Sequence, residues 1–279
     1  MQFVRRGSGA PLLLVHGLGN TRRAWDPVIP LLEQRRELVI VDLPGHGASP
    51  AEEDSGSGAG LARSLERFIV THGFGGVDMV GASLGGRLVL EIARRGLGKR
   101  IVALDPSGFI RGWERSYVAA SLIGAITMLR GVRPAIGPLA HAAPARTAML
   151  LQLSARPWAL DPDLIAHELA AIARTPHAQS LVLNQAWGPP QEGSAEAGPR
   201  VTIGWGRHDR LLLPQQAGRA LAAFPGAALH WFDGSGHFPG WDEPQEVARL
   251  ILGTAATMKK GAEEGPPRPV SVSSRPDQA

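Results

Sequence analysis

A serine with small neighbours stands where a predicted strand turns into a predicted helix. The segment G-A-S-L-G at residues 81–85 fits the pattern G-x-S-x-G, an apolar run precedes it, and an amphipathic segment begins at Leu84. A nucleophile elbow holds its serine in a strained backbone conformation, which requires small flanking residues. The pattern therefore predicts that Ser83 is a nucleophile. The alternative is an ordinary strand-to-helix turn with a helix-capping serine.

A serine hydroxyl needs a neighbouring base, and the base needs an acid that orients it. Of the nine histidines, His237 is the best placed, because it follows the last predicted strand in a loop rich in glycine. Asp209 follows the preceding predicted strand and is the candidate acid, with Asp105, after an earlier strand, as the competing candidate. The residue types predict a Ser-His-Asp triad.

Two further turns are expected near the same end of the sheet. The segment H-G-L-G at residues 16–19 follows the first buried strand, and its glycines let a backbone N–H face a developing negative charge. A second donor would be the N–H of Leu84, at the N-terminal end of the helix after Ser83. The alternative for residues 16–19 is a plain glycine turn. His46, in the tight loop at 42–49, is interpreted as structural.

The elements that position these residues alternate along the chain. Short apolar runs and amphipathic segments follow one another, as is typical of an α/β fold with a mostly parallel twisted sheet and flanking helices. The strands are predicted at 11–15, 38–42, 77–81, 100–104, 201–205 and 228–232, and the helices at 24–35, 60–72 and 84–95.

The strand signal stops in the middle of the chain. Helix-like stretches punctuated by prolines occupy residues 109–198, and this predicts an inserted helical cap on a core formed by 1–108 and 199–256. The last segment, 257–279, is rich in Pro, Ser and charge, and we expect it to be disordered.

Composition excludes several classes of function. The chain has 279 residues and no cysteine, so thiolate metal sites and cysteine nucleophiles are ruled out, and no metal or cofactor is predicted. The net charge is +4, but the basic residues are scattered, which argues against nucleic-acid binding. The longest uncharged apolar stretch, between Arg115 and Arg130, is too short for a membrane span. Without a secretory signal at the N-terminus, we expect a cytoplasmic protein with a small-molecule substrate.

The order of the motifs resembles the α/β-hydrolase family over about residues 2–256. The resemblance implies Ser83 as nucleophile, Asp209 as acid and His237 as base, with the N–H groups of Leu18 and Leu84 as oxyanion donors. It also implies that the helical insertion roofs the pocket. The chain departs from the family at its start, where residues 1–9 leave room for little more than one leading strand, so a shortened N-terminal edge is expected. The motifs are H-G-L-G at 16–19, D-L-P-G-H-G-A-S at 42–49, G-A-S-L-G-G at 81–86, G-R-H-D at 206–209 and G-S-G-H at 234–237.

A serine at the elbow argues against the dehalogenases and epoxide hydrolases of the family, which use a carboxylate nucleophile. We therefore expect a serine hydrolase of carboxylic esters, thioesters or related acyl substrates, apolar to aromatic, that forms an acyl-enzyme. Trp113, Tyr117 and Met128 in the cap are predicted to line the substrate pocket, the alternative being that they form the core of the cap itself.

Two other functions stay open. One is a C–C bond hydrolase, or a biosynthetic lyase or cyclase on the same fold. Cap arginines such as Arg111, Arg133 and Arg156 would then hold a substrate carboxylate. The other is a non-catalytic ligand-binding protein, against which the intact triad counts.

Overall fold

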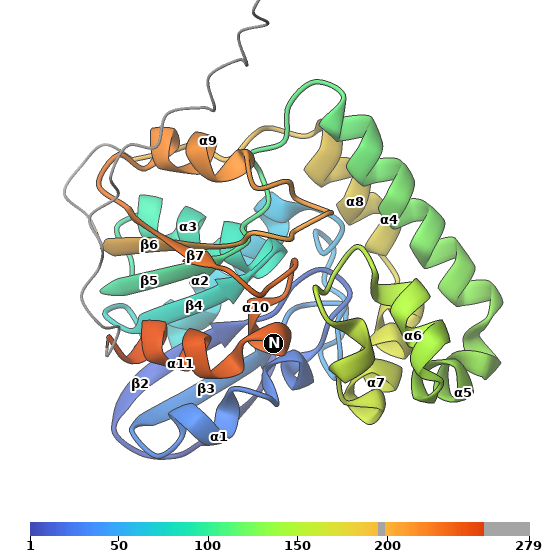
Figure 1. Ribbon diagram of the computed structural model, residues 1–279. Helices are drawn as coiled ribbons and strands as arrows, with labels where there is room; N and C mark the ends of the chain where they lie inside the picture. Colours follow the sequence, from blue (N-terminus) through green and yellow to red (C-terminus); the bar gives the residue numbers. More distant parts are fainter. Residues whose placement is uncertain (195–198, 254–279) are drawn as a thin grey trace, which may run out of the picture.

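The computed structural model describes residues 1–194 and 199–253, so the tail predicted at 257–279 lies outside the described residues. Its strands form one sheet in the order β1-β3-β2-β4-β5-β6-β7 (Figure 1). All neighbours are parallel except β1, which runs antiparallel to β3. The strands are β1 (Gln2–Arg6), β2 (Ala10–Val15), β3 (Arg36–Asp42), β4 (Asp78–Ala82), β5 (Arg100–Leu104), β6 (Arg200–Gly206) and β7 (Ala228–Phe232).

Helices cover both faces of the sheet. On β2, Leu13 and Val15 are buried in one cluster with residues of α2, α3 and α9, whereas Leu12 and Leu14 are buried in a second cluster with residues of α1 and α11. A strand buried on both faces has a continuous apolar sequence. The helices are α1 (Ile29–Leu32), α2 (Gly58–Thr71), α3 (Leu84–Arg94), α9 (Gln216–Ala223) and α11 (Pro244–Leu252), with the short α10 (Pro239–Asp242) before α11.

The structure confirms the α/β class, the six predicted strands to within two residues and the leading strand. The single helix predicted at 24–35 is wrong. The segment instead forms a 3-10 turn, η1 (Arg22–Trp25), and the one-turn helix α1. The reason is Pro27, because its ring nitrogen has no N–H to donate to the carbonyl four residues earlier.

Between β5 and β6 the described chain is helical. The helical region, residues 109–194, lies beyond one end of the sheet (Figure 1) and has a small apolar core of its own. Its longest element is α4 (Glu114–Gly131). The others are η2 (Arg133–Ala135), α5 (Ile136–His141), α6 (Ala143–Leu150), η3 (Pro157–Ala159), α7 (Pro162–Arg174) and α8 (Ala178–Trp187).

Buried polar contacts attach the helical region to the rest of the chain. Glu114, at the start of α4, forms an ion pair with Arg219 of α9 and accepts a hydrogen bond from Gln215. On the other side, Asp242 of α10 accepts a hydrogen bond from the Ser154 hydroxyl at 2.6 Å. These bonds hold the helices in one position over the sheet end.

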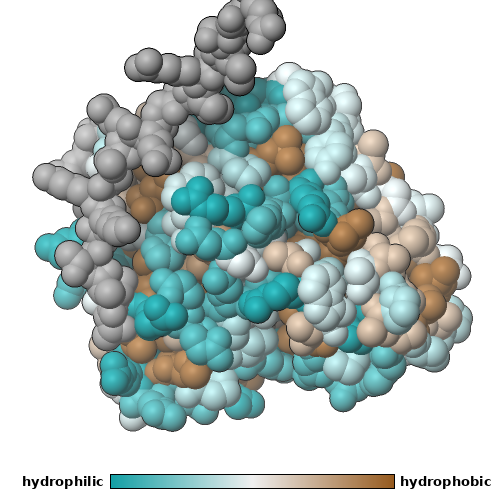
Figure 2. Space-filling view, viewed as in Figure 1, coloured by the Kyte–Doolittle hydropathy of each residue, from teal (hydrophilic) through white to brown (hydrophobic). Residues whose placement is uncertain are grey.

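The surface of the helical region is more apolar than that of the sheet half. Figure 2 shows hydrophobic patches over it, beside a largely hydrophilic surface over the core. Searched over the described residues, the chain contains no helix long and apolar enough to cross a membrane. Six of the eight exposed large apolar side chains belong to this region: Trp113, Met128, Leu151, Trp158, Leu183 and Trp187.

Candidate active site

The turn from β4 into α3 holds one serine, Ser83, in a strained backbone conformation. Ser83 has φ 54° and ψ −116°, a conformation that a non-glycine residue rarely adopts. The turn is so tight that a Cβ atom on Gly81 would lie 2.1 Å from the carbonyl oxygen of Gly85, so position 81 tolerates only glycine. The strand and the helix thus present the Ser83 hydroxyl at the sheet edge, where it is nine-tenths buried.

A chain of two hydrogen bonds starts at this serine. The Ser83 hydroxyl lies 2.9 Å from Nε2 of His237, and Nδ1 of His237 lies 2.8 Å from Oδ2 of Asp209. Because the carboxylate is an acceptor, Nδ1 carries the proton and Nε2 is left to accept from the serine. This geometry can deprotonate the hydroxyl and stabilise the imidazolium that forms.

The loops after two parallel strands bring the acids into the site. The carboxylate of Asp209 is fixed by the N–H groups of Leu211 and Leu212, which donate to its Oδ1 at 2.8 and 2.9 Å. Asp105, the competing candidate, instead accepts a hydrogen bond from the N–H of Gly206 at 2.9 Å. The structure therefore places Asp209, and not Asp105, against the His237 ring.

The turn at 16–19 lies beside the serine. Leu18 lines the cavity at Ser83, and Leu84 is the first residue of α3, where a backbone N–H has no partner within the helix. His16 holds this turn in place: its Nδ1–H donates to the Gly17 carbonyl at 2.7 Å, and its Nε2 accepts from the Leu43 N–H at 3.0 Å. Burial lowers the pKa of His16, so the ring stays neutral and serves as a structural bridge.

A carboxylate from the helical region ties down the same loop. Glu168 of α7 is fully buried and accepts hydrogen bonds from the side chain of Asn20 and from both the N–H and the hydroxyl of Thr21. Burial raises the pKa of Glu168 to about 7. The contact joins α7 to the loop that carries Leu18, so the packing of the helical region and the geometry of the loop are linked.

This linkage gives the stability of the protein a defined pH dependence. The folded-state pKa of Glu168, about 7, lies above its ordinary value of 4.5. Protonated Glu168 therefore contributes its full stabilisation below pH 4.5. As the pH rises from 4.5 through 7, the free energy of unfolding falls by on the order of 3 kcal/mol. We expect Glu168→Gln, which cannot ionise, to flatten this part of the pH profile.

Urea unfolding of both proteins at several pH values between 4.5 and 8 measures the effect. Gln179→Glu, on α8, introduces a carboxylate at a half-buried position outside the site and serves as a control for the charge change. Parallel pH profiles for the wild type and Glu168→Gln would contradict the assignment.

An apolar cavity of about 80 Å³ opens above Ser83 and His237. Of the three residues predicted to line the substrate pocket, Met128 lines this cavity, whereas Trp113 and Tyr117 do not. Trp113 is 65% exposed, and the Tyr117 hydroxyl donates a hydrogen bond to the Arg210 carbonyl at the outer edge of the core. The apolar lining is Leu18, Ile110, Val118, Leu122, Ala125, Ile126, Met128, Leu129, Met149, Leu153, Leu169, Ile172, Leu211, Leu212 and Phe238.

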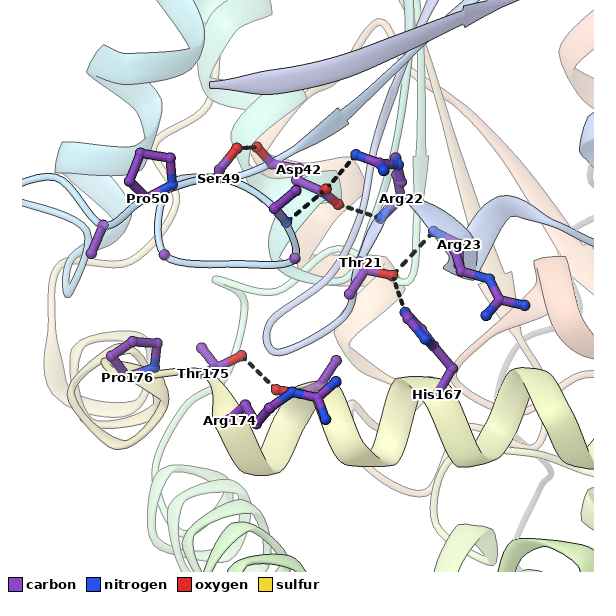
Figure 3. Close-up of a pocket in the computed structure, with 15 residues that line it drawn as sticks. Thr21, Arg22, Arg23, Asp42, Ser49, Pro50, His167, Arg174, Thr175 and Pro176 are labelled. Atoms are coloured by element: carbon purple, nitrogen blue, oxygen red, sulfur yellow. Dashed lines mark hydrogen bonds and ion pairs between the residues drawn. The ribbon is translucent and has the colours of Figure 1, made fainter. Parts of the chain in front are cut away.

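A larger cleft of about 540 Å³, lined in part by charged side chains, lies beside α7 (Figure 3). His167 and Arg174 face it from α7, and Arg22 faces it from η1 while paired with Asp42 at 2.8 Å. Ile172, on the other side of α7, faces the apolar cavity. The helix thus separates the cleft from the triad, so the smaller cavity is the one that can hold a reacting group.

Several polar residues of the site were not predicted. Asn20, Ser107 and Gln185 line the apolar cavity, and Asp242 fixes the histidine loop by accepting from the N–H of Gly236 at 2.8 Å. Asn20 directly follows the H-G-L-G motif, which is a signal the sequence offered. For Glu168 the sequence offered no such signal, because nothing in its own segment indicates a contact with the loop at Thr21, almost 150 residues away.

One cluster in the described residues has the spacing that a metal ion would need. A side-chain ligand atom from each of Asp105, Asp209 and His237 lies within 4.8 Å of the others. Nδ1 of His237 is already hydrogen-bonded to Asp209, so the three side chains form two carboxyl groups beside an imidazole.

Comparison with known sequences gives matches along most of the chain. A family model described as "Alpha/beta hydrolase family" matches residues 12–250. An uncharacterized protein of Mycobacterium tuberculosis is 31% identical over 262 residues, covering 88% of this chain and 75% of that protein. A 2-hydroxy-6-oxo-6-phenylhexa-2,4-dienoate hydrolase of Burkholderia cepacia is 26% identical, covering 88% of this chain and 87% of that enzyme.

Solved structures share the fold. A thermophilic esterase from Thermogutta terrifontis superimposes with a TM-score of 0.70 at 19% identity, covering 91% of this chain and 92% of the esterase. A meta-cleavage product hydrolase from Pseudomonas fluorescens gives a TM-score of 0.69 at 19% identity, covering 90% and 92%. At these identities the likeness concerns the fold and not the substrate.

Proposed function

The chain belongs to the α/β hydrolase family and is an enzyme, and on that premise we propose that it is a serine hydrolase of carboxylic esters, thioesters or related acyl compounds with an apolar acyl group. The observation that carries the proposal is the chain of hydrogen bonds from Ser83 through His237 to Asp209. The helical region, residues 109–194, is proposed to be the cap of the substrate pocket, and the last four residues of the cap expected from the sequence, 195–198, lie outside the described residues.

The reaction follows from the atoms in place. Oγ of Ser83 attacks the substrate carbonyl carbon while its proton passes to Nε2 of His237. The carbonyl oxygen becomes an oxyanion and accepts hydrogen bonds from the N–H groups of Leu18 and Leu84. His237 then gives its proton to the leaving alcohol or thiol, and an acyl-enzyme forms. A water molecule that loses a proton to His237 attacks the ester, and Ser83 leaves with the proton restored.

The lining of the cavity supports a neutral, apolar acyl group. Except for His237, no titratable side chain lines it in the described residues, and most of its surface comes from aliphatic side chains and methionines. A buried substrate charge would find no partner there and would cost several kcal/mol. An apolar chain gains about 0.8 kcal/mol for each methylene group that it buries.

A C–C bond hydrolase is the second candidate, and the relative from Burkholderia cepacia, whose name describes a dienoate hydrolase, favours it. A dienoate substrate carries a carboxylate. None of the three arginines predicted to hold a carboxylate lines the cavity: Arg111 and Arg133 are exposed, and the Arg156 guanidinium donates to the Asp242 carbonyl. The acyl hydrolase is therefore preferred.

Two measurements test the proposal. A serine-directed phosphonate should label Ser83, as located by mass spectrometry of peptides, and a panel of p-nitrophenyl esters of increasing acyl length should be hydrolysed. A 2-hydroxy-6-oxo dienoate in the same assay examines the second candidate. An adduct on another serine, or turnover of the dienoate alone, would refute the acyl hydrolase.

Substrate preference should depend on the methionines of the cavity wall. Met149→Ala removes a flexible apolar side chain from the small cavity. We expect it to shift the ranking of esters toward longer acyl chains, by about 1–3 kcal/mol in relative kcat/KM, the scale of methylene discrimination in apolar pockets. Met128→Ala should act in the same direction.

The control is Trp113→Ala, which removes a large but exposed side chain of the same region. The ranking of esters should not change in this variant. Equal losses on all esters in Met149→Ala, or a change in thermal stability alone, would show that Met149 belongs to the core of the helical region and does not select the acyl chain.

A further inference from the structure

Two buried carboxyl groups lie side by side behind the histidine. Asp105 is fully buried and Asp209 is 2% exposed, and one oxygen of each lies within 4.8 Å of the other. They come from the ends of neighbouring parallel strands, β5 and β6, which brings them to the same edge of the sheet. The mechanism above uses Asp209 and leaves Asp105 without a role.

The surroundings do not neutralise two negative charges at this place. The titratable groups that face Asp105 are Asp209 after β6, His237 after β7 and Asp242 of α10. Within 1–194 and 199–253, no arginine or lysine makes a hydrogen bond or ion pair with the side chain of Asp105 or Asp209. Like charges so close in a buried site cannot both be ionised at low cost, so one of the two carboxyls keeps a proton.

The hydrogen bonds indicate which one. Asp209 accepts three bonds, from two backbone N–H groups and from His237, and each of them stabilises its ionised form. Asp105 accepts one bond on Oδ1, from Gly206, and its Oδ2 is buried with no partner. An ionised Asp105 has only acceptor oxygens, whereas a proton on Oδ2 makes it a donor toward Asp209. Burial and the charge of Asp209 raise the pKa of Asp105 well above its ordinary value.

We propose that Asp105 is a positioning residue of the triad: as a neutral carboxylic acid it donates a hydrogen bond from Oδ2 to the carboxylate of Asp209. The predicted effect of Asp105 on turnover rests on the proposed serine hydrolase, whereas its predicted protonation state does not. The donated bond leaves the negative charge on Asp209, where it faces the imidazole. It also adds a donor to the two backbone N–H groups, of Leu211 and Leu212, that already bind this carboxylate.

The backbone of Asp105 supports a specific use of this residue. Its φ is 42°, one of only two positive values at non-glycine residues in the described ranges, the other being that of Ser83. Aspartate and asparagine tolerate this region better than other residues with side chains. In this conformation Oδ1 of Asp105 accepts a hydrogen bond from Gly206, three residues before Asp209.

Asp105→Asn is the decisive variant because its amide reproduces the neutral acid. The amide oxygen can accept from the Gly206 N–H while the NH₂ group donates to Asp209. We expect kcat on the best p-nitrophenyl ester to stay within about threefold of the wild type. Asp105→Gly, which keeps the positive φ without strain, removes the donor and should lower kcat about tenfold or more. Equal losses in the two variants would overturn the proposal.

Two readouts do not depend on turnover. Infrared difference spectra of the full chain at pH 8, wild type minus Asp105→Asn, should contain the carbonyl stretch of a buried neutral carboxylic acid, because Glu168 is present in both proteins and cancels. The folded-state pKa of Asp105 is raised, so the wild type loses stability relative to Asp105→Asn as the pH rises above about 4, whereas Glu168 contributes equally to both proteins. The Tm values should coincide near pH 4, and Asp105→Asn should be more stable by about 2 °C or more at pH 8.

These readouts separate the inference from the proposed function. If no ester is hydrolysed but the infrared band and the Tm difference are present, the hydrolase proposal fails and the state of Asp105 holds. If esters are hydrolysed but the band is absent and the Tm difference does not change with pH, the inference on Asp105 is wrong. Elemental analysis of the purified protein adds a check, since one divalent metal ion per chain that is lost in Asp105→Asn would also overturn it.

Discussion

Replacement of Ser83 by alanine is expected to lower kcat on p-nitrophenyl esters by about 10⁴-fold or more, without loss of the fold. The hydroxyl is the only group in the cavity that has both a base at 2.9 Å and a position at the start of a helix. Without it no acyl-enzyme can form, and only binding and the oxyanion donors remain, which leave a small residual rate.

Steady-state kinetics and a burst of product in the first turnover measure this effect. The burst reports acyl-enzyme formation and should vanish in Ser83→Ala. Ser121→Ala is the control, because its hydroxyl bonds only to the Val118 carbonyl in α4. A Ser83→Ala protein that keeps the wild-type rate on every ester would show that the elbow is a structural turn.

The second large effect is expected from Asp209→Asn, which should lower kcat by about 10⁴-fold at neutral pH. The amide nitrogen of an asparagine cannot accept the Nδ1 proton of His237, so the ring would favour the tautomer with its proton on Nε2. That tautomer has no lone pair for the Ser83 hydroxyl. The fold should persist, because the two backbone donors on Oδ1 can still bind the amide oxygen.

The comparison with position 105 makes this prediction specific. Asp209 and Asp105 are both buried and both follow a strand of the sheet, but only Asp209 touches His237. The kcat values of the two Asp→Asn variants, measured on the same ester across pH, should differ by several powers of ten. A large loss at 105 with full activity at 209 would assign the orienting acid to Asp105.

Much of the fold followed from local pattern. Strands buried on both faces have continuous apolar runs, and this placed six of them to within two residues. The elbow at Ser83 could also be predicted from the sequence, because so tight a turn requires glycine at a fixed spacing from the serine. In the structure, a Cβ atom on Gly81 would lie 2.1 Å from the carbonyl oxygen of Gly85. The helix at 24–35 was mispredicted because the prediction followed the spacing of the apolar residues and neglected Pro27, which lacks the N–H that a continuous helix needs.

The sequence by itself determined the class of fold, the serine, and the histidine that reaches it, because each depends on residues close together in the chain. Tertiary structure alone decided which aspartate meets His237, since that choice rests on how two strand ends about 100 residues apart are aligned. It also decided the cavity wall. Residues 116–129 of α4 carry no charge to mark a solvent side, so Ile126 and the exposed Trp113 at its start could not be told apart until α7 and α8 packed on one face. Packing across the fold, which local periodicity does not encode, therefore selects the residues that line the cavity.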